Sequence, residues 1–146
     1  MKISGDDYID GASERISAAR MMYGSDRFVD AIYFAGVAVE CILRAYANED
    51  DEFESRHDLR RLLRAATLEH FVGEKQREAV SAALGEVWAR WKNNYRYVGD
   101  RRLRSEIKRL QLDRGIKGDA LKENARVAIE SAYTLVNKGT VQWKKK

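Results

Sequence analysis

No proline occurs anywhere in the 146-residue chain. Proline interrupts helices more effectively than any other residue and often marks turns, so its absence favours long helices over a turn-rich β sandwich. Hydrophobic residues make up 45% of the chain, which is enough to give such helices a common core. We therefore predict an all-α fold: an up-and-down bundle of about four to five main helices with short extra helices, in a single domain over residues 1–146.

Apolar residues recur at helical spacing in several stretches and so place the helices. The stretch over 28–46 is apolar on nearly all sides, which is typical of a central, buried helix. Serine and aspartate side chains commonly cap helices, and four of them precede helical stretches. The predicted helices are one from the cap Ser4 to Gly24, one from the cap Ser25 to Tyr46, one over 74–91, a short basic one after the cap Asp100, and a last one from the cap Asp119 to Gly139.

The remaining segments are predicted to be peripheral. An acidic run over 48–56 cannot bury much surface, so we expect a loop there. Residues 57–66 have the periodicity of a short amphipathic helix with an arginine face. The basic tail over 140–146 is expected to be frayed.

Charge is distributed unequally along the chain. Residues 1–55 hold 5 Lys+Arg against 12 Asp+Glu, whereas residues 56–146 hold 22 against 11. Two explanations remain open. In one, the acidic half packs against the basic half, in this molecule or in a symmetric partner. In the other, the basic half presents a nucleic-acid surface.

Several kinds of chemistry lack their usual motifs. His57 and His70 are the only histidines and are not spaced as a metal pair, so we predict no metal site. Glycine-rich phosphate loops and the GxSxG elbow are missing, and no cofactor is predicted. Cys41 is the only cysteine and lies in an apolar stretch, where a thiol is usually inert. With no apolar run long enough for a membrane span, we expect a soluble, cytoplasmic protein.

Glu40 is the lone carboxylate in the middle of the apolar helix, and a buried charge must be paired or functional. Arg44 lies four residues further on and can reach it, which favours an ion pair within the helix. In the alternative interpretation, Glu40 faces a polar cleft and orients arginines of a later loop.

The densest polar and aromatic group runs from Trp88 to Asp100, with the sequence WARWKNNYRYVGD. Aromatic rings interleaved with Arg, Lys and Asn are suited to stacking on bases and to holding phosphates. A structural alternative places Trp88 and Trp91 in the core and pairs Arg90 and Arg96 with acids of the first half.

With these residues in view, the chain resembles the HEPN domain family of small helical bundles found in nucleotide-binding and ribonuclease proteins. The resemblance extends from residue 8 to about 137. It rests on four segments: 31–45 (AIYFAGVAVECILRA), His57-Asp58-Leu59 followed by Leu62-Leu63, Tyr95-Arg96-Tyr97 with Gly99-Asp100, and the alanine-rich stretch 125–136.

The resemblance implies a bundle that commonly forms a homodimer and carries a polar cleft near its final helices. In the family's ribonuclease branch, an arginine in that cleft is followed about four to six residues later by a histidine that acts as an acid or base. Here Arg90-x4-Tyr95-x-Tyr97 is similar to the branch pattern Arg-x4-His-x-Tyr, with tyrosine in place of the histidine. A phenol with a pKa near ~10 is a poor base at neutral pH. Arg64-x5-His70 meets the bare spacing but lies before the 74–91 helix, and we interpret it as a chance match.

Our leading hypothesis is a dimeric HEPN-like module that binds RNA or a nucleotide without standard ribonuclease catalysis. Its expected partner is a nucleotidyltransferase-like protein, in a toxin–antitoxin or defence setting, as the resemblance implies. One alternative is a metal-independent endoribonuclease using Arg90, Tyr95, Arg96 and Glu40, and the other is a structural dimerisation scaffold. The predicted binding residues are Arg90, Asn93, Asn94, Tyr95, Arg96, Tyr97, Arg101, Arg102 and Arg104.

Overall fold

The computed structural model describes residues 1–47 and 73–145 of the chain, and over these residues it is all-α. The loop predicted over 48–56 and the helix predicted over 57–66 lie outside the described residues, as does His70. The described elements are α1 (Gly5–Gly24), α2 (Phe28–Ala47), α5 (Glu74–Arg90), the 3₁₀ turn η1 (Asn93–Tyr97), α6 (Asp100–Arg109) and α7 (Ala120–Lys144).

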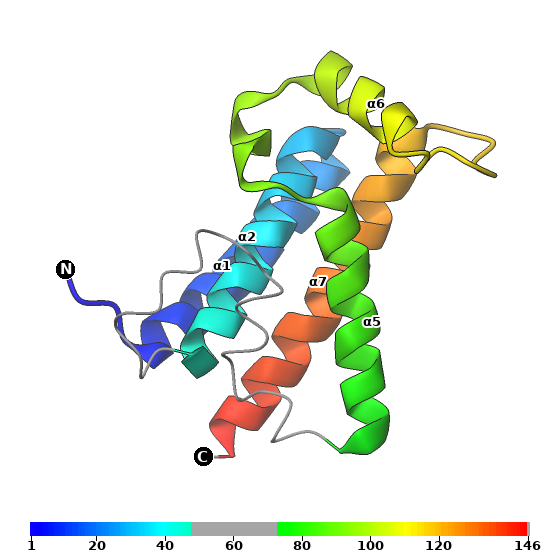
Figure 1. The fold of residues 1–146 in the computed structure, drawn as a ribbon. Coiled ribbons are helices and arrows are strands. Elements are labelled where there is room, and N and C mark those ends of the chain that lie inside the picture. Colours follow the sequence, from blue (N-terminus) through cyan, green and yellow to red (C-terminus); the bar gives the residue numbers. More distant parts are fainter. Residues whose placement is uncertain (48–72, 146) are drawn as a thin grey trace.

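The four long helices form an up-and-down bundle (Figure 1). A short connection returns α2 antiparallel to α1, as short helix–helix links require. On the other side of the bundle, α5 lies along α7, and the short α6 crosses one end (Figure 1). This arrangement confirms the predicted fold class.

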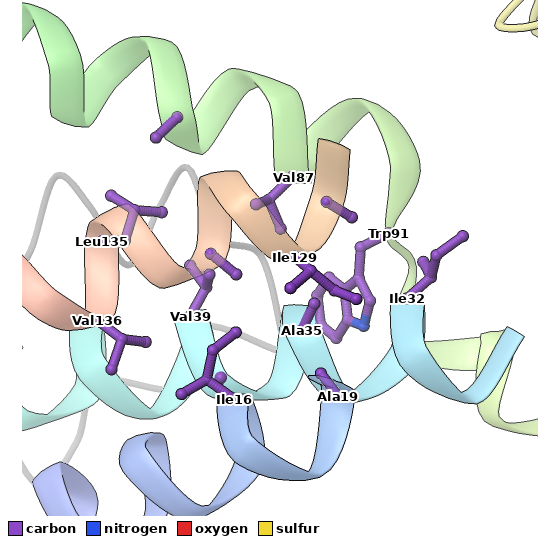
Figure 2. Close-up of a cluster of buried hydrophobic side chains, with 14 of the residues drawn as sticks. Ile16, Ala19, Ile32, Ala35, Val39, Val87, Trp91, Ile129, Leu135 and Val136 are labelled. Atoms are coloured by element: carbon purple, nitrogen blue, oxygen red, sulfur yellow. The ribbon is translucent and has the colours of Figure 1, made fainter. Parts of the chain in front are cut away.

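Helix α2 is the centre of the bundle. Most of its residues are buried, in agreement with a sequence that is apolar on nearly all sides. Figure 2 shows Val39 and Ala35 of α2 meeting side chains from α1, α5 and α7, among them Ile16, Val87 and Ile129. One core therefore joins all four long helices.

Two of the four predicted caps are confirmed. Ser4 forms a reciprocal capping box with Asp7, and the Asp119 carboxylate accepts the N–H groups of Leu121 and Lys122. The predicted N-terminal cap at Ser25 is wrong. Ser25 instead caps the C-terminus of α1, and the chain turns at Asp26, where φ is 59°.

The predicted cap at Asp100 is also wrong. The N-cap of α6 is Gly99, and no side chain caps this end. Asp100 lies inside the first turn of the helix, where it accepts a hydrogen bond from Nε of Arg104 at 2.6 Å. The aspartate therefore stabilises the helix from one position further along, by an ion pair along the helix face.

Helix α7 does not end at Gly139 as predicted, but continues to Lys144. Gly139 is buried inside the helix, and a Cβ there would lie 2.4 Å from Ile42 Cγ1. In the added turn, Trp143 Nε1 donates to Asp6 at 2.7 Å, and the ring packs edge-to-face on Tyr46. The segment expected to be frayed is thus helical over 140–144 and tied to the start of α1.

None of the helices described here is both long and apolar enough to cross a membrane.

Candidate nucleic-acid interface

The polar turn η1 is anchored to the bundle by two buried aromatic side chains. Trp91 ends α5, is buried, and donates from Nε1 to the backbone carbonyl of Tyr33 at 3.1 Å. Tyr95, in the middle of the turn, is also buried. Because these two anchors lie four residues apart, the turn between α5 and α6 is fixed while Asn94, Arg96 and Tyr97 remain exposed.

A cavity of about 120 Å³ lies where this turn meets α6. Arg102 and Glu106 reach it from α6 because residues four apart share one face of a helix. The turn and its flanks contribute Lys92, Asn94, Tyr95 and Val98. The cavity therefore combines cations, an amide, a carboxylate and a phenol, a set of groups that can recognise a polar, anionic ligand.

The carboxylate in this cavity is held in its charged form. Hydrogen bonds from Arg109 and the nearby charge of Lys92, whose Nζ lies 3.6 Å from Glu106 Oε1, lower the pKa of Glu106 to about 2. Burial, together with the negative charge of Glu106, raises the pKa of the Tyr95 phenol above its ordinary value. Tyr95 is consequently neutral near pH 7 and can act there as a hydrogen-bonding group but not as a base.

Arg96 and Tyr97 form an exposed stacked pair beside the cavity. The Arg96 guanidinium lies 4.6 Å from the centre of the Tyr97 ring, and Tyr97 is 75% exposed. A guanidinium and an exposed aromatic ring in this arrangement can hold a phosphate and stack on a base.

Arg90, a leading site candidate from the sequence, is held by contacts within the protein. Its Nε donates to Asn124 Oδ1 at 2.8 Å, and its Nη1 donates to the Glu86 carboxylate at 2.7 Å and to the Glu86 carbonyl at 3.0 Å. The side chain is 14% exposed. These contacts tie α5 to α7 and leave little of the guanidinium for a ligand.

Arg104 is likewise engaged within the protein. It pairs with Asp100 on its own helix and makes two hydrogen bonds, at 2.8 and 3.2 Å, to the Asp119 carboxylate at the start of α7. The charge of Arg104 therefore links α6 to α7 and is largely neutralised.

The structure thus brings together part of the predicted set. Asn94, Tyr95 and Arg102 share the cavity, Arg96 and Tyr97 lie on the same turn, Arg101 is exposed on α6, and Asn93 is half-buried. The predicted binding residues leave out three lining residues, Lys92, Val98 and Glu106, of which the first two lie within the polar and aromatic segment from Trp88 to Asp100. The four-residue spacing of Arg102 and Glu106 was the signal that could have found the carboxylate.

Glu40, the remaining catalytic candidate, forms the predicted ion pair within α2. It is buried, and its Oε1 accepts a hydrogen bond from Arg44 Nη2 at 2.9 Å. Burial raises the pKa of the neighbouring Cys41 thiol, with Glu40 adding to the effect, which agrees with an inert cysteine. Among the described residues, no group of histidine, cysteine and carboxylate side chains could hold a metal ion.

The sequence profile of the HEPN domain matches residues 6–139, which is nearly the whole chain. The chain belongs to the HEPN family. Comparison with curated proteins and with solved structures gave no match. Family membership associates the chain with RNA- or nucleotide-linked function, and HEPN domains commonly dimerise.

Proposed function

We propose that this HEPN chain is a dimeric module that binds RNA or a nucleotide without standard ribonuclease catalysis. Its binding surface, the turn–α6 interface, consists of Lys92, Asn94, Tyr95, Arg96, Tyr97, Arg101 and Arg102. The observation that carries the proposal is the stacked Arg96–Tyr97 pair beside the polar cavity.

The charge of this surface supports an anionic ligand. Arg101 and Arg102 are exposed on the first turn of α6 and pair with no carboxylate within residues 1–47 and 73–145. Among the described residues, Glu106 is the one carboxylate that lines the cavity, and Arg109 and Lys92 neutralise it. Phosphate groups are therefore favoured over cationic ligands at this site.

Two observations argue against standard catalysis. The family's ribonuclease branch relies on an arginine followed by a histidine, and Tyr95 occupies the histidine position with a raised pKa. Arg90, at the arginine position, is bound by Asn124 and Glu86. Neither the base nor the free arginine is available in the usual form.

The partner part of the proposal rests on family membership. A homodimer is expected because HEPN domains commonly dimerise. We extend the proposal to a nucleotidyltransferase-like partner in a toxin–antitoxin or defence setting, which size-exclusion chromatography with light scattering and co-purification of neighbouring gene products would test.

RNA binding followed across a salt series, with cleavage followed on a gel without metal, tests the central claim. The informative variants are Arg96→Ala and Arg102→Ala. Lys75→Ala is the matched control, because Lys75 is exposed in the first turn of α5, at the opposite end of that helix from the turn–α6 interface (Figure 1). We expect each interface variant to weaken binding and to reduce the salt slope by about 1, whereas Lys75→Ala has no effect.

Other outcomes would replace the proposal. Metal-free cleavage that is lost in Arg96→Ala would make the protein an endoribonuclease. Absence of both binding and cleavage, in a protein that still dimerises, would favour the structural scaffold.

A further inference from the structure

A buried amide joins three segments of the chain behind the turn–α6 interface. Asn124 lies near the start of α7 and is only 1% exposed. Its Oδ1 accepts a hydrogen bond from Nε of Arg90 at 2.8 Å. Its Nδ2 donates to the backbone carbonyl of Leu112 at 3.0 Å and to that of Ala120 at 2.8 Å. This side chain therefore ties both the end of α5 and the segment after α6 to α7.

The partners of the amide allow it one orientation. A guanidinium can only donate and a backbone carbonyl can only accept, so the oxygen of Asn124 must face Arg90 and the nitrogen must face the two carbonyls. In this orientation the oxygen and both N–H groups are used. An aspartate of the same shape could still accept from Arg90. It could not bind the carbonyls of Leu112 and Ala120, because a carboxylate has no hydrogen to donate.

Leu112 closes the C-terminal end of α6. Its N–H donates to the carbonyl of Ile107 at 3.0 Å, and the N–H of Gln111 donates to that of Lys108 at 3.1 Å. Together with the left-handed backbone at Gln111, where φ is 60°, these bonds form a Schellman motif. Glycine is the usual residue at the left-handed position, since other side chains are strained there. Such strain persists only where the surrounding structure holds it.

The hydrogen bond from Asn124 to Leu112 holds this end of α6 from inside the protein. The side chain of Leu112 is itself partly buried against the core. A further polar link from α6 to α7, the ion pair of Arg104 with Asp119, has side chains that are 43% and 36% exposed. Solvated ion pairs contribute little to stability, whereas a buried carbonyl that loses its donor is costly. The amide is therefore the stronger of these two links.

We propose that Asn124 is a positioning residue of the turn–α6 interface, which acts by holding the end of α6 through Leu112. Arg102 and Glu106 line the cavity from this helix. Glu106 directly precedes Ile107, whose carbonyl accepts from Leu112, so release of that end lets the cavity-lining face of α6 turn away. Asn124 does not itself line the cavity, and its effect on RNA binding rests on the proposed function.

Two substitutions break the two sides of the amide separately. Asn124→Asp keeps the acceptor for Arg90 and removes the donor to Leu112. Arg90→Ala breaks the other side and leaves the link to α6 intact, so it is the matched control. We expect Asn124→Asp to raise the Kd for a single-stranded RNA oligonucleotide by about 2- to 30-fold, the range for residues that act on a site without touching its ligand. Arg90→Ala should leave the Kd per folded molecule unchanged.

Amide hydrogen exchange measured by NMR gives a second readout that needs no RNA. Relative to the Val39 amide in the buried centre of α2, the Leu112 amide should exchange about 5-fold faster in Asn124→Asp, as expected for the loss of one hydrogen bond. The comparison with Val39 corrects for any general loss of stability. Arg90→Ala should leave this ratio as it is in the parent.

A substitution at Gln111 separates positioning from a general loss of stability. Glycine adopts a φ of 60° without strain, so Gln111→Gly should close the end of α6 without help from α7. In the Asn124→Asp background, we expect this second change to restore RNA affinity towards that of the parent. A merely structural role of Asn124 predicts no such restoration.

Three results would overturn the proposal: parental RNA affinity in Asn124→Asp, equal losses of affinity in Asn124→Asp and Arg90→Ala, or an unchanged exchange ratio at Leu112. Failure of the proposed function has a different signature. If the parent chain binds no RNA, the proposed function is lost, and the exchange ratio alone decides whether Asn124 holds the end of α6.

Discussion

The indole ring of Trp91 lies directly against Gly36. A Cβ added at Gly36 would fall 2.1 Å from Cδ1 of Trp91, far inside any van der Waals contact. The absence of a side chain at this point of α2 is what lets Trp91 reach the carbonyl of Tyr33. Since Trp91 ends α5 and precedes the polar turn, the glycine in the core helps to place the turn–α6 interface.

Gly36→Ala is therefore expected to destabilise the protein by about 1–3 kcal/mol, because the new methyl group displaces the indole ring. The control is Gly85→Ala on α5, where an added Cβ meets nothing within 4 Å. That change should stabilise the protein by about 0.5–1 kcal/mol, since glycine is unfavourable inside a helix. Chemical denaturation of both variants checks the pair. Equal effects would contradict the close packing of Trp91 on Gly36.

A second prediction concerns Tyr46, whose hydroxyl donates to the Gly139 carbonyl at 2.5 Å. Tyr46→Phe should cost about 1–3 kcal/mol, because a buried carbonyl loses its donor. Burial also raises the pKa of Tyr46 to about 12. The folded state therefore keeps this proton over a range of pH in which the unfolded chain has lost it, so stability should fall as pH rises from about 10 to about 12. Urea titrations at several pH values should show this fall in the parent and a smaller fall in Tyr46→Phe.

Much of the fold could be predicted because the signals for it are local. The 3.6-residue periodicity of α1, α2, α5 and α7 identifies the helices without any knowledge of their neighbours. The wrong predictions occur where the packing of neighbouring parts of the chain determines the local structure. Gly139 is expected just past the end of a helix because glycine is common at that position, but the close approach of Ile42 makes glycine necessary inside α7. Ser25 was predicted as a cap from residue type alone, whereas the turn at Asp26 assigns it to the preceding helix.

The same distinction holds at the candidate site. Asn94, Tyr95, Arg96 and Tyr97 are contiguous in the sequence, so their proximity could be predicted. The position of Arg90 could not, because its partner Asn124 lies 34 residues away on α7. Asn124 is a polar residue on the buried face of a helix that the apolar periodicity had identified as core. A lone amide on an apolar stripe indicates a buried polar partner, but the sequence does not say which.

Acid stability should depend on Glu106. Because hydrogen bonds from Arg109, together with Lys92, lower its pKa to about 2, the unfolded chain binds this proton at higher pH than the folded one. Stability from this group is therefore complete above about pH 4.5 and is lost as pH falls towards about 2. Glu106→Gln should lower stability near pH 7 by on the order of 1 kcal/mol or less, and the difference from the parent should vanish near pH 2.

The matched control for this prediction is Glu130→Gln. Glu130 also pairs with an arginine on its own helix, Arg126, but its side chain is 65% exposed. A solvated pair contributes less, so we expect a smaller loss of stability in this variant. Thermal unfolding of both variants from neutral to acid pH makes the comparison. A larger loss in Glu130→Gln would show that the pairing of Glu106 with Arg109 and Lys92 has little energetic weight.

A comparison of Arg90 with Arg96 distinguishes an arginine that stabilises the fold from one that binds RNA. Arg90→Ala removes the donor to Asn124 Oδ1 in a buried position and frees Glu86, so we expect a loss of about 1–3 kcal/mol in stability. RNA affinity per folded molecule should remain that of the parent. Arg96→Ala should do the reverse, because Arg96 is exposed and stacks on Tyr97. Denaturation and RNA binding measured on both variants give the two readouts. If Arg90→Ala kept its stability and lost binding or cleavage, Arg90 rather than Arg96 would be the arginine that contacts RNA.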